Sequence, residues 1–285
     1  MSIVTNKELL DAAKKGKYAV AAFNTNNLEY TQAILKAAEE MKSPVIVEAA
    51  KSEIDYMGGF TFVKMVETLA KDLSIPVGIH LDHGPSFEVA MNCIQYGFRS
   101  VMYDGSSLSL EENIANTQKV VEAAHACGIS VEGEIGVIGQ AADGPEGPAN
   151  DNAGLADPIE CEKFVKETGV DCFAAAIGNA HGLYAKEPEL RFDLLADIER
   201  RTQVPLVLHG GTGIPEKDLQ KAITMGVSKI NFSTVMRKGC IDTLVQTLKD
   251  NPNDYNLMAM LRPGFDKMVE IAKDHIRMVM SDGKA

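Results

Sequence analysis

Short apolar runs along this chain stop repeatedly at a residue that can bind a metal ion or transfer a proton. The polar residues at these ends are Asp82 and His83, Asp104, Glu132 and Glu134, His181, His209, and Asn231. In a parallel α/β barrel all strands end at the same rim, so residues distant in the chain are brought into one pocket. The pattern therefore predicts a metal site on an enzyme scaffold.

Strand-like and helix-like stretches alternate after a first helix that begins at the Thr5 cap, with Glu8 completing a capping box. The predicted strands are 18–23, 44–49, 76–81, 100–103, 130–135, 172–177, 205–208 and 229–232. The helices between and after them are 28–41, 60–73, 86–96, 110–127, 158–168, 192–201, 215–225 and 234–248. Because the strands are almost entirely apolar, we predict an α/β fold, a (β/α)8 TIM barrel. The alternative is an open doubly wound sheet, but no GxGxxG motif follows the first strand.

A chain of 285 residues with 45% hydrophobic content can bury one large core. We therefore expect a single domain over residues 1–285. Residues 249–285 form its C-terminal helical extension, with an amphipathic helix over about 264–280. The apolar face of this helix is expected to pack on the barrel or on a partner subunit.

The formal net charge of -12 and the lack of Lys/Arg clusters argue against nucleic acid or an anionic membrane as partners. No run approaches the roughly 18 apolar residues needed to span a bilayer. The five cysteines show no CxxC spacing, and the first residues do not resemble a secretory segment. These features indicate a cytoplasmic protein.

Three of the six histidines, His83, His181 and His209, follow predicted strands and each precedes a glycine. Catalytic zinc is commonly held by three protein ligands with one position open, which this set could supply. Asp82, next to His83, could act as a general acid or base on a substrate hydroxyl. The alternative for Asp82 is a helix cap, or a carboxylate that orients a metal ligand.

Asp104 and Glu134 also follow predicted strands. They could hold a second or displaced metal ion, or they could be structural carboxylates paired with a lysine. The sequence leaves both interpretations open.

Two loops at the predicted rim offer backbone N–H groups and hydroxyls where barrels usually bind phosphate. Their candidate residues are Gly210, Gly211 and Thr212 after one strand, and Asn231, Phe232, Ser233 and Thr234 after the next. Two such loops beside a candidate metal ligand predict an anion site.

At these residues the chain resembles the class II, metal-dependent ketose-bisphosphate aldolases, which include fructose- and tagatose-bisphosphate aldolases. The matching segments are Ala22-Phe23-Asn24, 43–46, His80-Leu81-Asp82-His83-Gly84, 131–134, Gly178-Asn179-Ala180-His181-Gly182, 204–213 and Lys229-Ile230-Asn231. They occur in order from the N-terminus to about residue 248, so the resemblance covers the whole expected barrel.

The resemblance implies a zinc ion held by His83, His181 and His209 that polarises the carbonyl of dihydroxyacetone phosphate and stabilises its enediolate. Asp82 would exchange the hydroxyl proton as the carbon-carbon bond breaks or forms, and Asn231 would lie near the enediolate. The implied substrate-binding residues are Asn24, Gly182, Gly210, Gly211, Thr212, Asn231, Phe232, Ser233 and Thr234. Asp104 and Glu134 match secondary metal positions, where a second cation, divalent or monovalent, could bind.

Three positions depart from the family pattern. Ala142 stands where the family has a loop glutamate that moves the carbon-bound proton, a role that Asp143 or Glu146 could take. Ala50 lies near the place of a substrate-contacting serine. Met258 stands in place of an arginine that reaches the distal phosphate in a neighbouring subunit. The donor half of the implied site is retained, whereas the half for the aldehyde has changed.

The expected activity is reversible cleavage of a ketose phosphate, by default fructose 1,6-bisphosphate, into dihydroxyacetone phosphate and an aldehyde. The alternatives are tagatose bisphosphate or another ketose phosphate as substrate, a metal-dependent sugar-phosphate isomerase or epimerase, and a non-catalytic aldolase-like subunit. A homodimer or homotetramer is the expected assembly.

Overall fold

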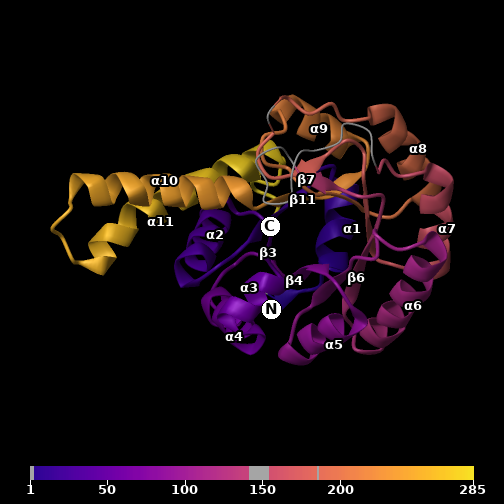
Figure 1. Ribbon diagram of the computed structural model, residues 1–285, viewed down its shortest axis with the longest axis horizontal. Helices are drawn as coiled ribbons and strands as arrows, with labels where there is room; N and C mark the ends of the chain where they lie inside the picture. Colours follow the sequence, from indigo (N-terminus) through magenta and orange to yellow (C-terminus); the bar gives the residue numbers. More distant parts are fainter. Residues whose placement is uncertain (1–2, 141–153, 185) are drawn as a thin grey trace.

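The computed structural model describes residues 3–140, 154–184 and 186–285. Within these residues, eight parallel strands close a barrel, with a ring of helices outside it (Figure 1). The barrel strands are β2 (Val20–Asn24), β3 (Val45–Ala50), β4 (Val77–Gly84), β5 (Ser100–Tyr103), β6 (Ser130–Ile135), β8 (Cys172–Ala175), β10 (Leu206–Leu208) and β11 (Val227–Phe232). Neighbours follow chain order, and β11 pairs with β2 to close the ring. The predicted TIM barrel is confirmed.

Helices pack their apolar faces onto the outside of the barrel, as parallel strands buried on both faces require. They are α2 (Leu28–Met41), α3 (Lys51–Met57), α4 (Gly59–Ala70), α5 (Phe87–Tyr96), α6 (Leu110–Ala126), α7 (Pro158–Thr168), α8 (Phe192–Thr202) and α9 (Glu216–Thr224). Helix α1 (Asn6–Gly16) begins with the predicted capping box of Thr5 and Glu8. Its Leu9 and Leu10 pack against residues of the barrel interior and so close the bottom of the barrel.

Several elements differ from the predicted ones. Helix α3, which ends before Gly58 with its φ of 81°, was not predicted, whereas α4 corresponds to the helix predicted over 60–73. A small second sheet pairs β7 (Gly139–Gln140) with β9 (Ala180–His181). The last helix, α11 (Leu257–Met278), begins earlier than predicted because the Asn256 side chain caps it by accepting from the N–H of Ala259.

Helices α10 (Thr234–Asp250) and α11 form a two-helix arm. In Figure 1 the arm extends away from the barrel, and its two helices lie side by side. The C-terminal part of α11 returns to the barrel, where Lys273 pairs with Glu40 of α2 and the carbonyl of Val279 accepts from the N–H of Ala19. Within the described residues, none of the helices combines the length and apolar character needed to cross a membrane.

Candidate active site

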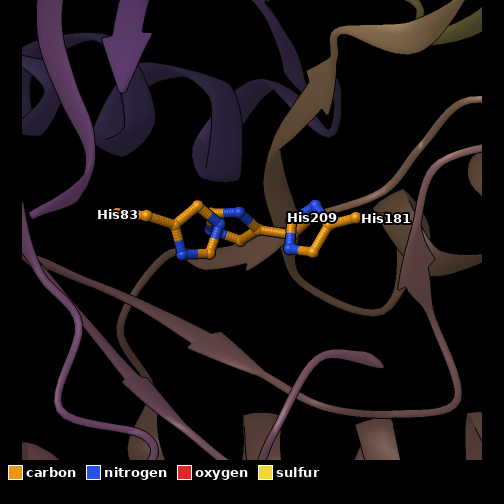
Figure 2. Close-up of side chains that lie close together, drawn as sticks. All are labelled: His83, His181 and His209. Atoms are coloured by element: carbon orange, nitrogen blue, oxygen red, sulfur yellow. The ribbon is translucent and has the colours of Figure 1, made fainter. Parts of the chain in front are cut away.

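The three predicted histidines meet at the C-terminal rim of the barrel, although they come from distant parts of the chain (Figure 2). His83 lies at the end of β4, His181 in β9, and His209 directly after β10. The ring centroid of His83 lies 4.9 Å from that of His181 and 4.5 Å from that of His209. One ring nitrogen from each lies within 4.8 Å of the others, a spacing at which they could hold one ion.

The backbone at His83 adopts a conformation that is uncommon for a residue with a side chain. Its φ is 45°, in the left-handed region, next to a register shift between β4 and β5. Such strain clusters at functional sites. His83 Nδ1 donates to Asp104 Oδ2 over 2.7 Å, and Nε2 is buried without a hydrogen-bond partner in the described part of the chain. An orphaned ring nitrogen beside two other imidazoles fits a metal ligand.

His209 is fully buried, and its two ring nitrogens have different partners. Nε2 donates to Glu132 Oε1 over 2.9 Å, because a carboxylate can only accept. Nδ1 lies 3.3 Å from Asn231 Nδ2 and 3.8 Å from Asp82 Oδ1. Nδ1 is therefore the nitrogen that faces the cluster, and the donor set fits a divalent ion such as zinc.

Asp82 lies between two side-chain amides at the centre of the cluster. Asn24 Nδ2 donates to its Oδ2 and Asn231 Nδ2 to its Oδ1, each over 3.1 Å. Oδ1 is also 3.9 Å from His83 Nε2. Burial raises the pKa of Asp82, but the electrostatic interactions with His83, His209 and Lys229 and the hydrogen bond from Asn24 outweigh burial and lower it. The carboxylate is therefore ionised and fixed in direction.

A second group of potential ligands shares His83. Ligand atoms of His83, Asp104 and Glu134 also lie within 4.8 Å of one another. Burial raises the pKa of Glu134 well above its usual value, and one of its oxygens has no partner within the described residues. A bound cation would supply that partner.

The charge distribution around the three imidazoles suits a cation. Burial lowers the pKa of His83, but the carboxylates of Asp82 and Asp104 outweigh burial and raise it to about 10. Burial and the positive charge of His83 lower the pKa of His181 to about 3. Among the three rings, His83 therefore carries the positive charge, beside carboxylates that would also favour a metal cation.

A cavity of about 610 Å³ opens above the cluster. It is lined by most of the predicted substrate-binding residues, namely Asn24, Gly182, Gly210, Thr212, Asn231, Ser233 and Thr234. Ser233 and Thr234 start α10, so backbone N–H groups at this helix end could receive an anion.

Two predicted substrate-binding residues do not line the cavity. The N–H of Gly211 donates to the carbonyl of Asn231 over 3.0 Å, and Ile230 and Phe232 fill the space beside its Cα. The ring of Phe232 is buried 5.8 Å from that of Phe23. Both residues pack behind the loops, and their contact with substrate stays a prediction.

The three departures from the family pattern have different places in the structure. Ala142, Asp143 and Glu146 lie outside the described residues. Ala50 lines the cavity. Met258 is 81% exposed at the start of α11, on the projecting arm.

Sequence reasoning missed Arg237, which lines the cavity from the first turn of α10. Its guanidinium donates to Ser233 Oγ over 2.6 Å and lies 3.3 Å from Glu53 Oε1. Among the described residues that line the cavity it is the one Lys or Arg. Its spacing, four residues after Ser233 on a helix, was the available signal.

Comparison with known proteins decides the family. The family model described as fructose-bisphosphate aldolase class-II matches residues 4–284. The chain belongs to the class-II fructose-bisphosphate aldolase family. It is thus a class-II aldolase, a lyase that acts on carbon-carbon bonds.

The relatives of this class-II aldolase carry different substrate names. The fructose-bisphosphate aldolase of Geobacillus stearothermophilus is 48% identical over 100% of this chain and 99% of its own length. The 6-phospho-5-dehydro-2-deoxy-D-gluconate aldolase of Bacillus subtilis (strain 168) is 43% identical over 100% of this chain and 98% of its own length. In structure, the YdjI aldolase from Escherichia coli K12 is similar, with a TM-score of 0.87, 34% identity and 99% of each chain covered.

Proposed function

We propose that this class-II aldolase cleaves fructose 1,6-bisphosphate reversibly into dihydroxyacetone phosphate and an aldehyde, with zinc held by His83, His181 and His209. The observation that carries the proposal is the convergence of three ring nitrogens within 4.8 Å of one another, beside an ionised Asp82. Two imidazoles have their outward nitrogens already hydrogen-bonded to Asp104 and Glu132. The nitrogens that would face the ion are His83 Nε2 and His209 Nδ1, and Nδ1 would exchange its contact with Asn231 Nδ2 for the ion.

When bound, the divalent ion polarises the substrate carbonyl and stabilises negative charge beside it. Asp82 accepts the substrate hydroxyl proton during cleavage and returns it during condensation. Asn24 and Asn231 hold its two oxygens, so the carboxylate cannot turn away from the substrate. Asn231, at the end of β11, also lines the cavity and would lie near the reacting atoms.

The phosphate of the three-carbon product would lie at Gly182, Gly210, Thr212, Ser233 and Thr234. These residues line one side of the cavity, and the N-terminus of α10 offers partial positive charge there. Asp104 and Glu134 would hold a second cation, or the first one in a displaced position.

The aldehyde half of the site supports a second candidate substrate. Ala50 lines the cavity where a hydroxyl was expected, and Arg237 is available to an anionic group of the aldehyde. A relative at 43% identity is named as acting on 6-phospho-5-dehydro-2-deoxy-D-gluconate. A ketose phosphate with another acidic aldehyde end is therefore the runner-up, and tagatose 1,6-bisphosphate is a further alternative.

The test measures release of dihydroxyacetone phosphate by the zinc-loaded protein from each of these three substrates. We expect fructose 1,6-bisphosphate to give the highest kcat/KM, and chelation of zinc to abolish turnover. His209→Ala should lose both zinc and cleavage, whereas Asp82→Ala should keep zinc and lose roughly 10²–10⁴-fold in rate.

His125→Ala is the matched control, because its ring lies on the outside of α6 and contacts Asp171. This variant should keep zinc and activity. Undiminished cleavage by metal-stripped His209→Ala would refute the proposed chemistry. If another of the three substrates gave a higher kcat/KM, that compound and not fructose 1,6-bisphosphate would be the preferred substrate.

We also propose that the protein is a cytoplasmic homodimer or homotetramer. All five cysteines are free thiols, as expected in a reducing compartment. The α10–α11 arm carries exposed apolar side chains, which a second copy of the chain could cover.

A further inference from the structure

Two glutamates and one lysine lie inside the barrel, below the cavity, where barrels ordinarily pack branched apolar residues. They are Glu48 of β3, Glu132 of β6 and Lys229 of β11, and each is 0% exposed. Lys229 Nζ lies 2.9 Å from Glu132 Oε2 and 3.3 Å from Glu48 Oε2. Removing charges from water costs several kcal/mol per ion. A buried group of this kind therefore needs a reason beyond stability.

Glu132 connects this buried group to the candidate metal ligands. Its Oε1 accepts from His209 Nε2 over 2.9 Å. Its Oε2 accepts from Lys229 and lies 3.3 Å from His80 Nε2, while His80 Nδ1 lies 2.9 Å from Ser100 Oγ. Each carboxylate oxygen thus has its own donors. Because Lys229 occupies one oxygen, the other remains directed at His209.

We infer that Glu132 and Lys229 are positioning residues for His209. Glu132 holds the proton of His209 on Nε2, so that Nδ1 presents its lone pair to the metal ion. Lys229 holds Glu132 in the orientation that does so. The inference rests on the proposed metal site, but it concerns residues that do not themselves touch the ion or the substrate.

The alternative tautomer shows why both residues matter. In Glu132→Gln the side chain keeps its shape but has one acceptor oxygen and one NH2 group. The charged Lys229 attracts the oxygen, so the NH2 group turns toward His209 and donates to Nε2. The proton of His209 then moves to Nδ1, which can no longer bind the metal.

The experiment measures zinc affinity by competition with a chelator, and the visible spectrum of the cobalt(II)-substituted protein. Glu132→Gln and Lys229→Met should each weaken zinc binding by roughly 10–100-fold, the usual effect of losing such an outer contact. Both should also alter the cobalt spectrum, which reports the coordination geometry. The isosteric Glu132→Gln keeps the test valid if Lys229→Met fails to fold.

Combining Glu132→Gln with Lys229→Met separates positioning from a merely structural role. Without the Lys229 ammonium, the oxygen of the introduced amide is free to accept from His209, so zinc affinity should recover partly toward the wild-type value. The control is Glu48→Gln, which alters the other carboxyl beside Lys229 without touching Glu132 or His209. Burial raises the pKa of Glu48 well above its usual value, so the neutral amide resembles the native group. The zinc affinity of this control should change less than about twofold, well below the usual effect of losing a contact to a metal ligand.

Wild-type zinc affinity in both single variants would overturn the inference. It would also be overturned if the loss of zinc-binding free energy in the double variant equalled the sum of the losses in the two single variants. An equal loss in Glu48→Gln would also overturn it, because a general weakening of the core would then suffice. If the wild-type protein binds neither zinc nor cobalt, the proposed metal site fails, and this inference fails with it.

Discussion

Gly210, directly after His209, has a φ of 66° and no space for a side chain. An added Cβ would collide with the carbonyl oxygen of Ala180, next to His181. Tyr184 joins the same two loops, since its hydroxyl accepts from the N–H of Ala180 and donates to the carbonyl of Gly210. The close approach of these loops thus sets the separation of two metal ligands.

Gly210→Ala should therefore separate His181 from His209. We expect zinc affinity and kcat/KM to fall at least about tenfold, in line with other disruptions around metal ligands. Zinc titration and the cleavage assay measure both. Gly128→Ala is the matched control, because Gly128 has a φ of 69° but nothing within 4 Å of an added Cβ. It should lose only about 1–2 kcal/mol of stability and no activity. Equal losses of zinc affinity in both variants would contradict the argument.

At the scale of elements, the end of α2 is tied to the turn that precedes β4, the strand of Asp82 and His83. Glu39 accepts from the N–H of Ser74 over 2.9 Å and from its hydroxyl over 2.8 Å. The hydrogen bond from Lys42, with those from Ser74, lowers the pKa of Glu39 in the folded protein. The contact thus adds stability only while the carboxylate is ionised.

Glu39→Gln should lower the free energy of unfolding by about 0.2–1 kcal/mol at pH 7, the range for partly exposed pairs. Because the folded pKa lies below the unfolded value, this stability is present above about pH 4.3 and disappears as the pH falls through the folded pKa. Urea unfolding between pH 7 and pH 3 measures whether the free energies of unfolding of the variant and the wild type converge as the pH falls. Glu67→Gln, which removes a pair within α4, is the control and should cost less. If the difference in free energy of unfolding between wild type and Glu39→Gln grew as the pH fell, the prediction would be contradicted.

At the scale of the whole molecule, the α10–α11 arm is the most apolar part of the described surface. Six of the thirteen large hydrophobic residues that are exposed lie between residues 241 and 258. Ile241, Val245 and Leu248 are spaced as one face of α10. A face of this kind on a projecting element is typical of contacts between subunits.

Val245→Asp combined with Leu248→Asp should shift the assembly toward monomers, since a charge in an apolar contact is costly. Light scattering coupled to size-exclusion chromatography measures the mass. Ile159→Asp is the control, because Ile159 is apolar and 66% exposed but lies on α7. An assembly that survives the double variant, or a monomeric wild type, would contradict the role of the arm.

Much of the architecture follows from local patterns in the chain. Apolar strands alternating with amphipathic helices predict the barrel. The spacing of apolar residues distinguishes helix from strand, and the strict alternation of the two predicts a parallel sheet. His83, His181, His209 and Asp82 are identifiable in advance, because a barrel places every strand end on one rim. The start of α11 and the short helix α3 were not predicted, since capping contacts decide where such elements begin and end.

Contacts between strands supplied what local patterns could not. The sequence places His209 directly after a strand. The position of the proton on its ring, however, depends on Glu132 from β6 and Lys229 from β11. The packing around Gly211 and Phe232 likewise depends on neighbouring strands and loops, since the ring of Phe232 lies against Gly211 and 5.8 Å from that of Phe23. The chain's periodicity specifies which residues reach the rim. Their orientation there depends on partners distant in sequence, which come into contact only when the barrel closes.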